Sequence, residues 1–535
     1  MPQYLLLIAV VIFVCVLGNK VSSRLGIPML LAFILLGMFF GSDGLVKIRF
    51  DNYTFAEQIC SVALIFIMFY GGFGTNWRAA RPVAPQAILL SSAGVVLTAG
   101  FTGLFCHLAL RMDWLESLLI GSVIGSTDAA SVFAIIRSRR LNLKDHTASL
   151  LEVESGSNDP FSYMLTAIVL SVMGGTVSGR AIAYLLFSQV VYGLVLGAAI
   201  AGATLWLLKR FRFCTAGFDA IFVLGIAILS YAAPAALGGN GYLSAYVVGI
   251  ILGNSPLKNK TSLVHFFDGL TGLMQMLIFF LLGLLAFPSQ MPKVILPSLA
   301  IALFLTFAAR PAAVAVILTP FRCSWRQQIL VAWSGLRGAA SIVFAIMATT
   351  NPAVMENDIF HMVFCIVLFS ILVQGSLIPF AARRLQMIDE NTNVLKTFND
   401  YTAEVPVQFI RFSIRPEHPW ANRTLQEILL PPDTLVVLLL RDQERIVPNG
   451  NTRILPGDVM ILSAKAVGTL EGISLTELQV ESGSPWIGRP IAGLDTGPDK
   501  LIIMIQRGEK IIIPRGTTTI LEGDLLVMNE SNSTA

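Results

Sequence analysis

Apolar residues fall into long runs along the first 384 positions of the chain. A helix that crosses a bilayer needs about 20 such residues in succession. The pattern predicts thirteen transmembrane helices, near residues 3–19, 27–41, 55–71, 83–108, 114–136, 147–173, 181–208, 217–235, 241–253, 263–287, 292–318, 327–349 and 359–381. Residues 1–384 are therefore expected to form a polytopic α-helical membrane domain.

The apolar pattern ends after Arg384, and residues 385–404 are polar enough to predict a linker. The remaining chain repeats itself at an offset of 66, since P-W-A-N-R from Pro419 returns as P-W-I-G-R from Pro485. A repeat at a fixed period indicates duplicated structural units. We therefore predict two units, over residues 405–466 and 467–535.

Each predicted unit has a β-rich run, at 435–440 in the first unit and 501–505 in the second. Each also has the turn sequence L-x-G-D, which ends at Asp458 and again at Asp524. Short strands separated by Gly and Pro are typical of a small sheet module. We expect the tail to be an α+β domain. It either regulates the membrane domain or is a structural module that only pairs subunits, since a repeat alone says nothing about ligands.

Composition agrees with a membrane protein, because 55% of residues are hydrophobic, 13% are charged and the mean hydropathy is +0.73. Basic residues mark cytoplasmic loops. With an external N-terminus, seventeen basic residues fall on the cytoplasmic side and five on the other. This predicts a cytoplasmic tail. The net charge of +4 then reflects orientation, and no nucleic-acid partner is expected.

Six cysteines form no C-x-x-C pair, and five histidines have no metal-ligand spacing. We therefore expect no resident metal, disulfide framework or bound cofactor. The chain also lacks a nucleophile–base constellation, so an enzyme is not expected.

Two polar segments interrupt the predicted spans: G-S-T-D-A-A-S at 125–131 and E-S-G-S-N-D-P at 154–160. A charge at bilayer depth costs roughly 2.5–3.5 kcal/mol on insertion scales, so such groups usually face a cavity and mark an ion path. These segments are the candidate functional site.

Residues four apart share a helix face, which places Glu154 with Asn158 and Ser155 with Asp159. Pro160 has no N–H to donate and loosens the helix there, which frees backbone carbonyls. A dehydrated monovalent cation needs such a set of carboxylate, hydroxyl and carbonyl oxygens.

Small residues surround Asp128 in one span and Arg337 in another, as S-G-L-R-G-A-A-S at 334–341. Breaks of this kind expose the ends of half-helices, and side chains of opposite charge offset the dipoles at those ends. In transporters such breaks usually come in pairs, because they arise from inverted repeats. We predict two crossed, discontinuous helices; close packing through small residues is the alternative. Arg310 is expected to be a counter-charge, and Glu152 a solvated or snorkelling residue.

The series T-D, E-S-x-x-N-D and G-L-R-G-A resembles the cation:proton antiporter superfamily, in its NhaP-like branch, over residues 1–384. The resemblance implies that Asp159 alternately binds a proton and a cation. It also implies that Thr127 and Ser155 contribute oxygens.

The same resemblance assigns supporting roles within the site. Asp128 would stabilise the crossed helices, while Glu154 together with Arg337 would hold Asn158. An Asn–Asp pair in this family is associated with electroneutral exchange, because a single carboxylate carries either a proton or a cation.

One position departs from the family pattern. Many members carry an acid before the two glycines of the third span, whereas this chain reads F-Y-G-G with Tyr70. A phenol supplies no charge at neutral pH. Tyr70 is expected either to line the site without adding a carboxylate or to be an ordinary packed aromatic residue.

The tail resembles RCK or TrkA-C modules in tandem. This implies a homodimer and gating by a small ligand, such as the nucleotide cyclic di-AMP. The nucleotide-binding half that often precedes these modules is not expected, because no G-x-G-x-x-G follows a predicted strand.

We expect an electroneutral K⁺/H⁺ antiporter, with Na⁺ or Li⁺ exchange as the alternative. A ligand-gated potassium channel is a third possibility, because this type of tail also gates channels. The chain has no T-V-G-Y-G filter, which disfavours the channel.

Overall fold

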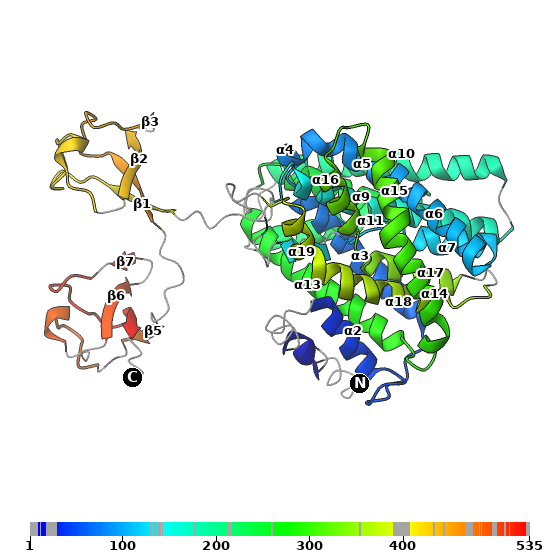
Figure 1. Cartoon of the computed structure of the whole chain (residues 1–535). Coiled ribbons are helices and arrows are strands. Elements are labelled where there is room, and N and C mark those ends of the chain that lie inside the picture. The colour runs from blue at the N-terminus through cyan, green and yellow to red at the C-terminus, as the bar shows by residue number, and fades with distance from the viewer. Residues whose placement is uncertain are drawn as a thin grey trace. The chain divides into compact units, whose positions relative to one another are not determined.

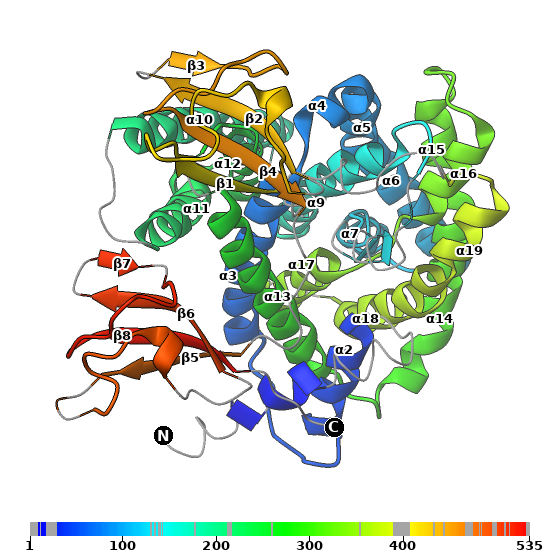
Figure 2. The same cartoon turned by 90° about the vertical axis from the view of Figure 1, so that its left-hand side faces the viewer.

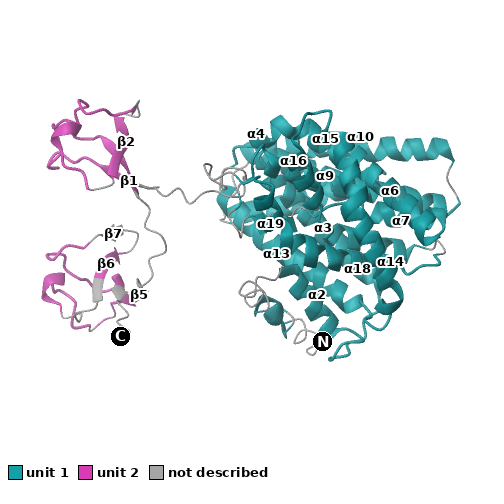
Figure 3. Ribbon diagram, viewed as in Figure 1, with its two compact units in different colours: residues 1–402 teal, residues 403–535 magenta. Residues whose placement is uncertain are grey.

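The structure is a computed structural model in which the chain forms two compact units, residues 1–402 and 403–535 (Figure 3). The described residues are 9–10, 12–17, 29–128, 131–132, 135–136, 141, 143–175, 178–210, 217–257, 260–351, 355–388, 407–431, 434–441, 444–465, 474–480, 482, 484–494, 500–507, 510–512 and 514–530.

The first unit is a helical bundle (Figure 1). Its α-helices are α2 Met29–Phe40, α3 Tyr53–Gly74, α4 Trp77–Ala80, α5 Ala84–Ser91, α6 Ala93–Leu110, α7 Trp114–Val123, α9 Thr147–Met173, α10 Gly179–Arg210, α11 Phe218–Ala236, α12 Gly241–Gly253, α13 Lys260–Leu285, α14 Met291–Phe304, α15 Arg310–Leu318, α16 Trp325–Trp333, α17 Ala339–Thr350, α18 Ile359–Phe369 and α19 Ser376–Arg384. The π-helical turns η2 Leu305–Ala309 and η3 Ser370–Gly375 lie between α14 and α15 and between α18 and α19.

Seven of the described helical segments are long and apolar enough to cross a membrane: 53–74, 77–110, 179–210, 218–236, 260–285, 291–318 and 359–384. Shorter apolar helices lie at 29–40, 114–123, 241–253 and 339–350. The predicted polytopic helical fold is confirmed. The number thirteen stays a prediction, because much of the first span, 3–19, lies outside the described residues.

Polar residues at the predicted boundaries start several of these helices. Asn52 accepts a hydrogen bond from the Phe55 N–H (2.9 Å), and Asn240 accepts one from the Leu243 N–H (3.0 Å). Such caps satisfy N–H groups that have no partner within the helix. They position α3 and α12, which pack against each other.

Glycines bring the central helices into close contact. A Cβ at Gly249 of α12 would overlap the Phe69 carbonyl of α3, and one at Gly283 of α13 would overlap the Ile34 carbonyl of α2. Small residues allow membrane helices to approach at backbone distance. Helices α3 and α13 also contact each other and lie side by side (Figure 2).

The residues that follow α19 pack back onto the bundle, although they lie beyond Arg384, where the membrane domain was predicted to end. Met387 is buried, and its carbonyl accepts a hydrogen bond from the Lys144 N–H (2.9 Å). The first residues of the predicted linker, 385–388, therefore pack on the helical unit, close to the start of α9. The rest of that linker lies outside the described residues.

The second unit contains two four-stranded antiparallel sheets. Their orders are β1-β4-β2-β3 and β5-β8-β6-β7. The strands are β1 Val407–Ser413, β2 Thr434–Arg441, β3 Glu444–Ile446, β4 Val459–Lys465, β5 Ser474–Gln479, β6 Lys500–Arg507, β7 Lys510–Ile512 and β8 Leu525–Glu530. Strands β2, β3 and β4 recur as β6, β7 and β8 at the offset of 66 seen in the sequence.

The strands predicted for the tail are confirmed, and the described residues of the second unit contain strands and short 3₁₀ turns but no α-helix, so the helical part of the expected α+β domain stays a prediction. The connections carry Gly and Pro, which do not favour helices. The predicted β-rich runs at 435–440 and 501–505 lie within β2 and β6.

The repeated L-x-G-D turn is held by a buried carboxylate. Asp524 accepts hydrogen bonds from the Leu521 N–H (2.9 Å) and from Arg507 Nε and Nη2 (both 2.7 Å). Asp458 makes the equivalent bonds to Leu455 and Arg441. Hydrogen bonding to the Arg507 guanidinium lowers the pKa of the Asp524 carboxyl below its usual value.

We expect Asp524→Asn to destabilise the second repeat by about 2–3 kcal/mol, because it removes a charged hydrogen-bond acceptor from a buried site. Hydrogen exchange of full-length protein should show faster exchange in β6 and β8 and unchanged exchange in β2 and β4. Asp458→Asn should give the reverse pattern. Since the folded-state pKa is lowered, the wild-type pair stabilises above the usual carboxyl pKa and loses its contribution as the pH falls through the folded value. Equal exchange in both repeats would contradict a local role.

Candidate functional site

Two interrupted spans cross within the helical unit. After α7 ends, residues 126–128 are non-helical, and residues 335–338 are non-helical between α16 and α17. The Asp128 N–H donates to the Leu336 carbonyl (2.8 Å), and Ser126 Oγ lies 3.3 Å from Ser341 Oγ. The predicted pair of crossed, discontinuous helices is present.

The two charges at the crossing meet opposite helix ends. Arg337, 1% exposed, donates through Nη1 to the Gly125 carbonyl (2.9 Å) and to the Ser126 carbonyl, where α7 has ended. The Asp128 carboxylate accepts from the Ser131 N–H (3.2 Å) at the start of the next helical residues. Cations at C-termini and anions at N-termini are the arrangement that helix dipoles favour.

Gly338 leaves room for Asp128 beside α17. A Cβ at Gly338 would overlap the Asp128 carboxylate. The carboxylate thus lies next to the N-terminus of α17 as well as its own following helix, so one negative charge serves two helix starts. Ala129 and Ala130 of the same predicted segment lie outside the described residues.

A buried ion pair supports the polar face of α9. Glu154 is 0% exposed and Arg310 is 2% exposed; Arg310 Nη2 donates to Oε1 and Oε2 of Glu154, both at 2.9 Å. The family resemblance implied that Arg337 would act with Glu154, which the structure contradicts. Arg310 follows the π-helical turn η2, and such turns are frequent at functional sites.

Asn158 joins this pair to the broken helix. Its Nδ2 donates to Thr127 Oγ1 (2.6 Å) and to Glu154 Oε1 (3.3 Å), and Thr127 Oγ1 lies 2.9 Å from Ser155 Oγ. A chain of polar contacts therefore runs from Arg310 through Glu154 to the residues beside Asp159.

Asp159 is 6% exposed, and no hydrogen-bond partner is found for its Oδ1 among the residues that the structure describes. No ion pair to it is found there either. Helix α9 continues through Pro160, whose carbonyl accepts from Asn240 Nδ2 (2.8 Å), so the loosening expected at this proline does not interrupt the helix. A buried carboxylate without a fixed counter-charge is suited to exchange its partner.

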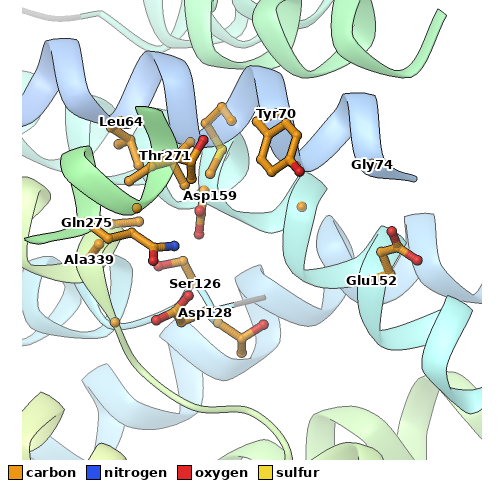
Figure 4. A pocket seen from close by; sticks show the side chains of 18 of the residues that line it. Leu64, Tyr70, Gly74, Ser126, Asp128, Glu152, Asp159, Thr271, Gln275 and Ala339 are labelled. Atoms are coloured by element: carbon orange, nitrogen blue, oxygen red, sulfur yellow. The ribbon is translucent and has the colours of Figure 1, made fainter. Parts of the chain in front are cut away.

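A cavity of about 330 Å³ adjoins these residues (Figure 4). Polar residues of its lining are Tyr70, Ser126, Thr127, Asp128, Glu152, Asp159, Asp268, Thr271 and Gln275. It also reaches Gly74, the last residue of α3. The cavity therefore extends from the crossing to the side of the bundle where α3 ends and α13 begins.

The cavity changes one sequence expectation, for Glu152, and bears on the two alternatives left open for Tyr70. Glu152, expected to be solvated, is 7% exposed and lines the cavity, because α9 turns this residue inward. Tyr70 lines the wall, stacks on Phe267 (centroids 6.5 Å apart) and donates its hydroxyl to Asp268 Oδ1 (3.4 Å).

Asp268, Thr271 and Gln275 of α13 were not singled out in the sequence. The signal for Asp268 was present, because an acid inside the predicted span 263–287 satisfies the same criterion as Asp128. No group of three or more potential metal ligands of the His, Cys, Asp and Glu types is found in the described part of the chain.

Comparison with known proteins identifies the fold and the family. Residues 9–384 match the transmembrane sodium/hydrogen exchanger family, and residues 409–470 and 475–528 each match the TrkA-C domain. The chain belongs to the sodium/hydrogen exchanger family. The resemblances to the NhaP-like antiporters and to tandem TrkA-C modules are thus confirmed.

Curated relatives cover most of the chain. It is 34% identical over 467 residues to the K(+)/H(+) antiporter NhaP2 of Shewanella sp. (strain MR-4), covering 86% of this chain and 80% of the relative. It is 33% identical over 451 residues to the K(+)/H(+) antiporter NhaP of Alkalimonas amylolytica, covering 84% and 78%. The Na(+)/H(+) antiporter ApNhaP of Aphanothece halophytica is 24% identical over 421 residues, which are 75% of this chain and 78% of the relative.

A solved structure shares the membrane fold. The sodium proton antiporter MjNhaP1 from Methanocaldococcus jannaschii superposes with a TM-score of 0.63 at 23% identity, covering 72% of this chain and 99% of that one. The agreement concerns the fold of the helical unit.

We expect Arg310→Met to destabilise the protein by about 3–5 kcal/mol, because it leaves Glu154 as an uncompensated buried charge. Glu154→Gln alone should cost a similar amount, since Arg310 then loses its partner. The double variant Glu154→Gln/Arg310→Met should recover much of the loss. Thermal unfolding of the purified protein measures all three, and strictly additive losses would show that the two residues do not act as a pair.

Proposed function

We propose that the protein exchanges K⁺ for H⁺ by alternating access, with both ions competing for Asp159. The observation that carries the proposal is the buried Asp159 carboxylate on a cavity wall. Thr127 and Ser155 lie beside it and supply hydroxyl oxygens, which together with a carboxylate suit a dehydrated alkali cation. Proton and cation cannot occupy the same oxygens, so their binding is mutually exclusive.

The charges around Asp159 support electroneutral exchange. Arg310 offsets Glu154, and the crossing carries one positive charge, on Arg337, and one negative charge, on Asp128. The Asp159 charge is then neutralised by whichever ion it carries. An empty, ionised Asp159 would be costly to move across the membrane barrier, which prevents uncoupled return.

Potassium is favoured over sodium by two observations. Two relatives that match more than four-fifths of the chain are named K(+)/H(+) antiporters, whereas the one named a Na(+)/H(+) antiporter is more distant. Tyr70 also adds no charge to the cavity wall, which suits a larger and less strongly hydrated ion.

The proposed setting is the bacterial inner membrane, with the N-terminus outside and the tail in the cytoplasm. The basic loop residues of the sequence support this orientation. The TrkA-C tail supports a homodimer whose exchange is regulated by a small cytoplasmic ligand, for which a nucleotide such as cyclic di-AMP is the candidate.

Exchange is tested with purified protein in vesicles that hold an imposed pH gradient. We expect K⁺ to dissipate the gradient and Na⁺ to do so more weakly. Asp159→Asn should abolish the response, because an amide cannot cycle a proton, while retaining the wild-type elution profile on size exclusion. Gradient loss with Na⁺ alone would identify a sodium exchanger, and activity retained by Asp159→Asn would overturn the assignment of the carrier. Single-channel current would indicate a channel.

Removal of residues 405–535 tests the role of the tail. We expect the truncated protein to keep K⁺-dependent exchange, since Asp159 and its partners all lie in the helical unit. Its pH dependence or its response to cyclic di-AMP should change. Identical responses of the full-length and truncated proteins would argue against regulation by the tail.

A further inference from the structure

Besides Asp128, Glu152 and Asp159, a fourth carboxylate lines the cavity and comes from helix α13. Asp268 is on α13, two turns from its start, and its side chain is exposed at the cavity. Tyr70 Oη donates to it at 3.4 Å, which is a long and weak bond. No ion pair to Asp268 is found among the described residues, so its charge faces the cavity without a fixed cation.

A buried hydroxyl lies one helical turn further along α13. Thr271 is 8% exposed and lines the same cavity, and its Oγ1 has no hydrogen-bond partner among the described residues. Residues three apart lie on one helix face, so Asp268 and Thr271 both line the same side of the cavity. Figure 4 shows Thr271 and Tyr70 around the space that also contains Asp159.

A polar group that is buried without a partner is costly and requires an explanation. Several buried hydroxyls in this helical unit donate to a backbone carbonyl of their own helix, as Thr166 does to Ser162 (2.8 Å). The Thr271 hydroxyl makes no such bond. A ligand that enters the cavity would satisfy it.

The available groups are all of one chemical kind. Asp268 offers a carboxylate, Thr271 a hydroxyl, and Gln275, one turn further, an amide oxygen that also lines the cavity. Hard oxygen ligands of this type suit alkali cations rather than anions or apolar molecules. The Tyr70 hydroxyl, which donates to Asp268, lies beside these oxygen ligands on the cavity wall.

We infer that Asp268 and Thr271 form an entry site for a monovalent cation, between the mouth of the cavity and Asp159. The inference rests on the proposed exchange function and deepens it. Negative charge in a cleft raises the local concentration of cations. Tyr70 of α3 supplies no negative charge to the cavity, and Asp268 of the neighbouring helix α13 supplies one instead. Ions would pass from Asp268 to Thr271 and then to Asp159.

The inference is tested by initial rates of exchange against K⁺ concentration, with full-length protein in vesicles. We expect Asp268→Asn to raise KM for K⁺ about fivefold, equal to about 1 kcal/mol at 1.4 kcal/mol per tenfold, with the maximal rate within about twofold of wild type. Thr271→Val, which keeps the shape and removes the hydroxyl, should raise KM about threefold, and Thr271→Ser should remain near wild type.

Two controls separate an ion site from a structural role. Asp268→Glu keeps the charge and should restore KM. Asp219→Asn makes the same change at the start of α11, outside the cavity lining, and should behave as wild type. An unchanged KM in both Asp268→Asn and Thr271→Val, or a lower maximal rate with KM unchanged, would overturn the inference. If Asp268→Asn does not fold, the Thr271→Val and Thr271→Ser pair decides.

A binding measurement keeps this test independent of the proposed function. A bound ion stabilises the folded protein. In the Asp159→Asn background, K⁺ should still raise the unfolding temperature, and adding Asp268→Asn should remove that increase. A K⁺ effect that survives the double change refutes the entry site even where exchange is confirmed. If the double change removes the K⁺-dependent rise in unfolding temperature, the entry site is supported, even where the wild type exchanges Na⁺ or no ion.

Discussion

Neutralisation of charge inside the membrane is the constraint on which this structure depends. An ionised side chain in a bilayer needs a partner or a cavity. Glu154 has Arg310 as its partner, and Arg337 binds the carbonyls left at the end of α7. Asp159 has the cavity instead. The groups with fixed counter-charges build the site, whereas Asp159, for which the described residues offer no ion-pair partner, lines the cavity.

Close helix packing makes this arrangement possible. The crossing brings Asp128 against Gly338, and the glycines of α12 and α13 place α3 and α13 at backbone contact with their neighbours. The cavity wall therefore comes from separate parts of the chain, including Tyr70 on α3 and Asp268 on α13. The proposed alternating access requires groups of helices that move as rigid units.

The buried carboxylates of the tail, unlike Asp159, have fixed counter-charges. Asp458 and Asp524 are buried, but each is bound by an arginine and by a backbone N–H within its own turn. Neither charge can exchange partners with ease. These carboxylates are thus fixed within the turns of the sheets, whereas Asp159 in the helical unit has no ion-pair partner among the described residues and lines the cavity.

The sequence by itself determined the apolar spans, the polar faces of α9, the paired breaks and the repeat at offset 66, because each is a local pattern along the chain. Only the tertiary structure decided that Glu154 pairs with Arg310 rather than Arg337, that Glu152 points inward, and that Asp268 faces Tyr70. These contacts join residues 156 and 198 positions apart. They depend on the rotation and spacing of packed helices, which hydrophobic periodicity does not specify.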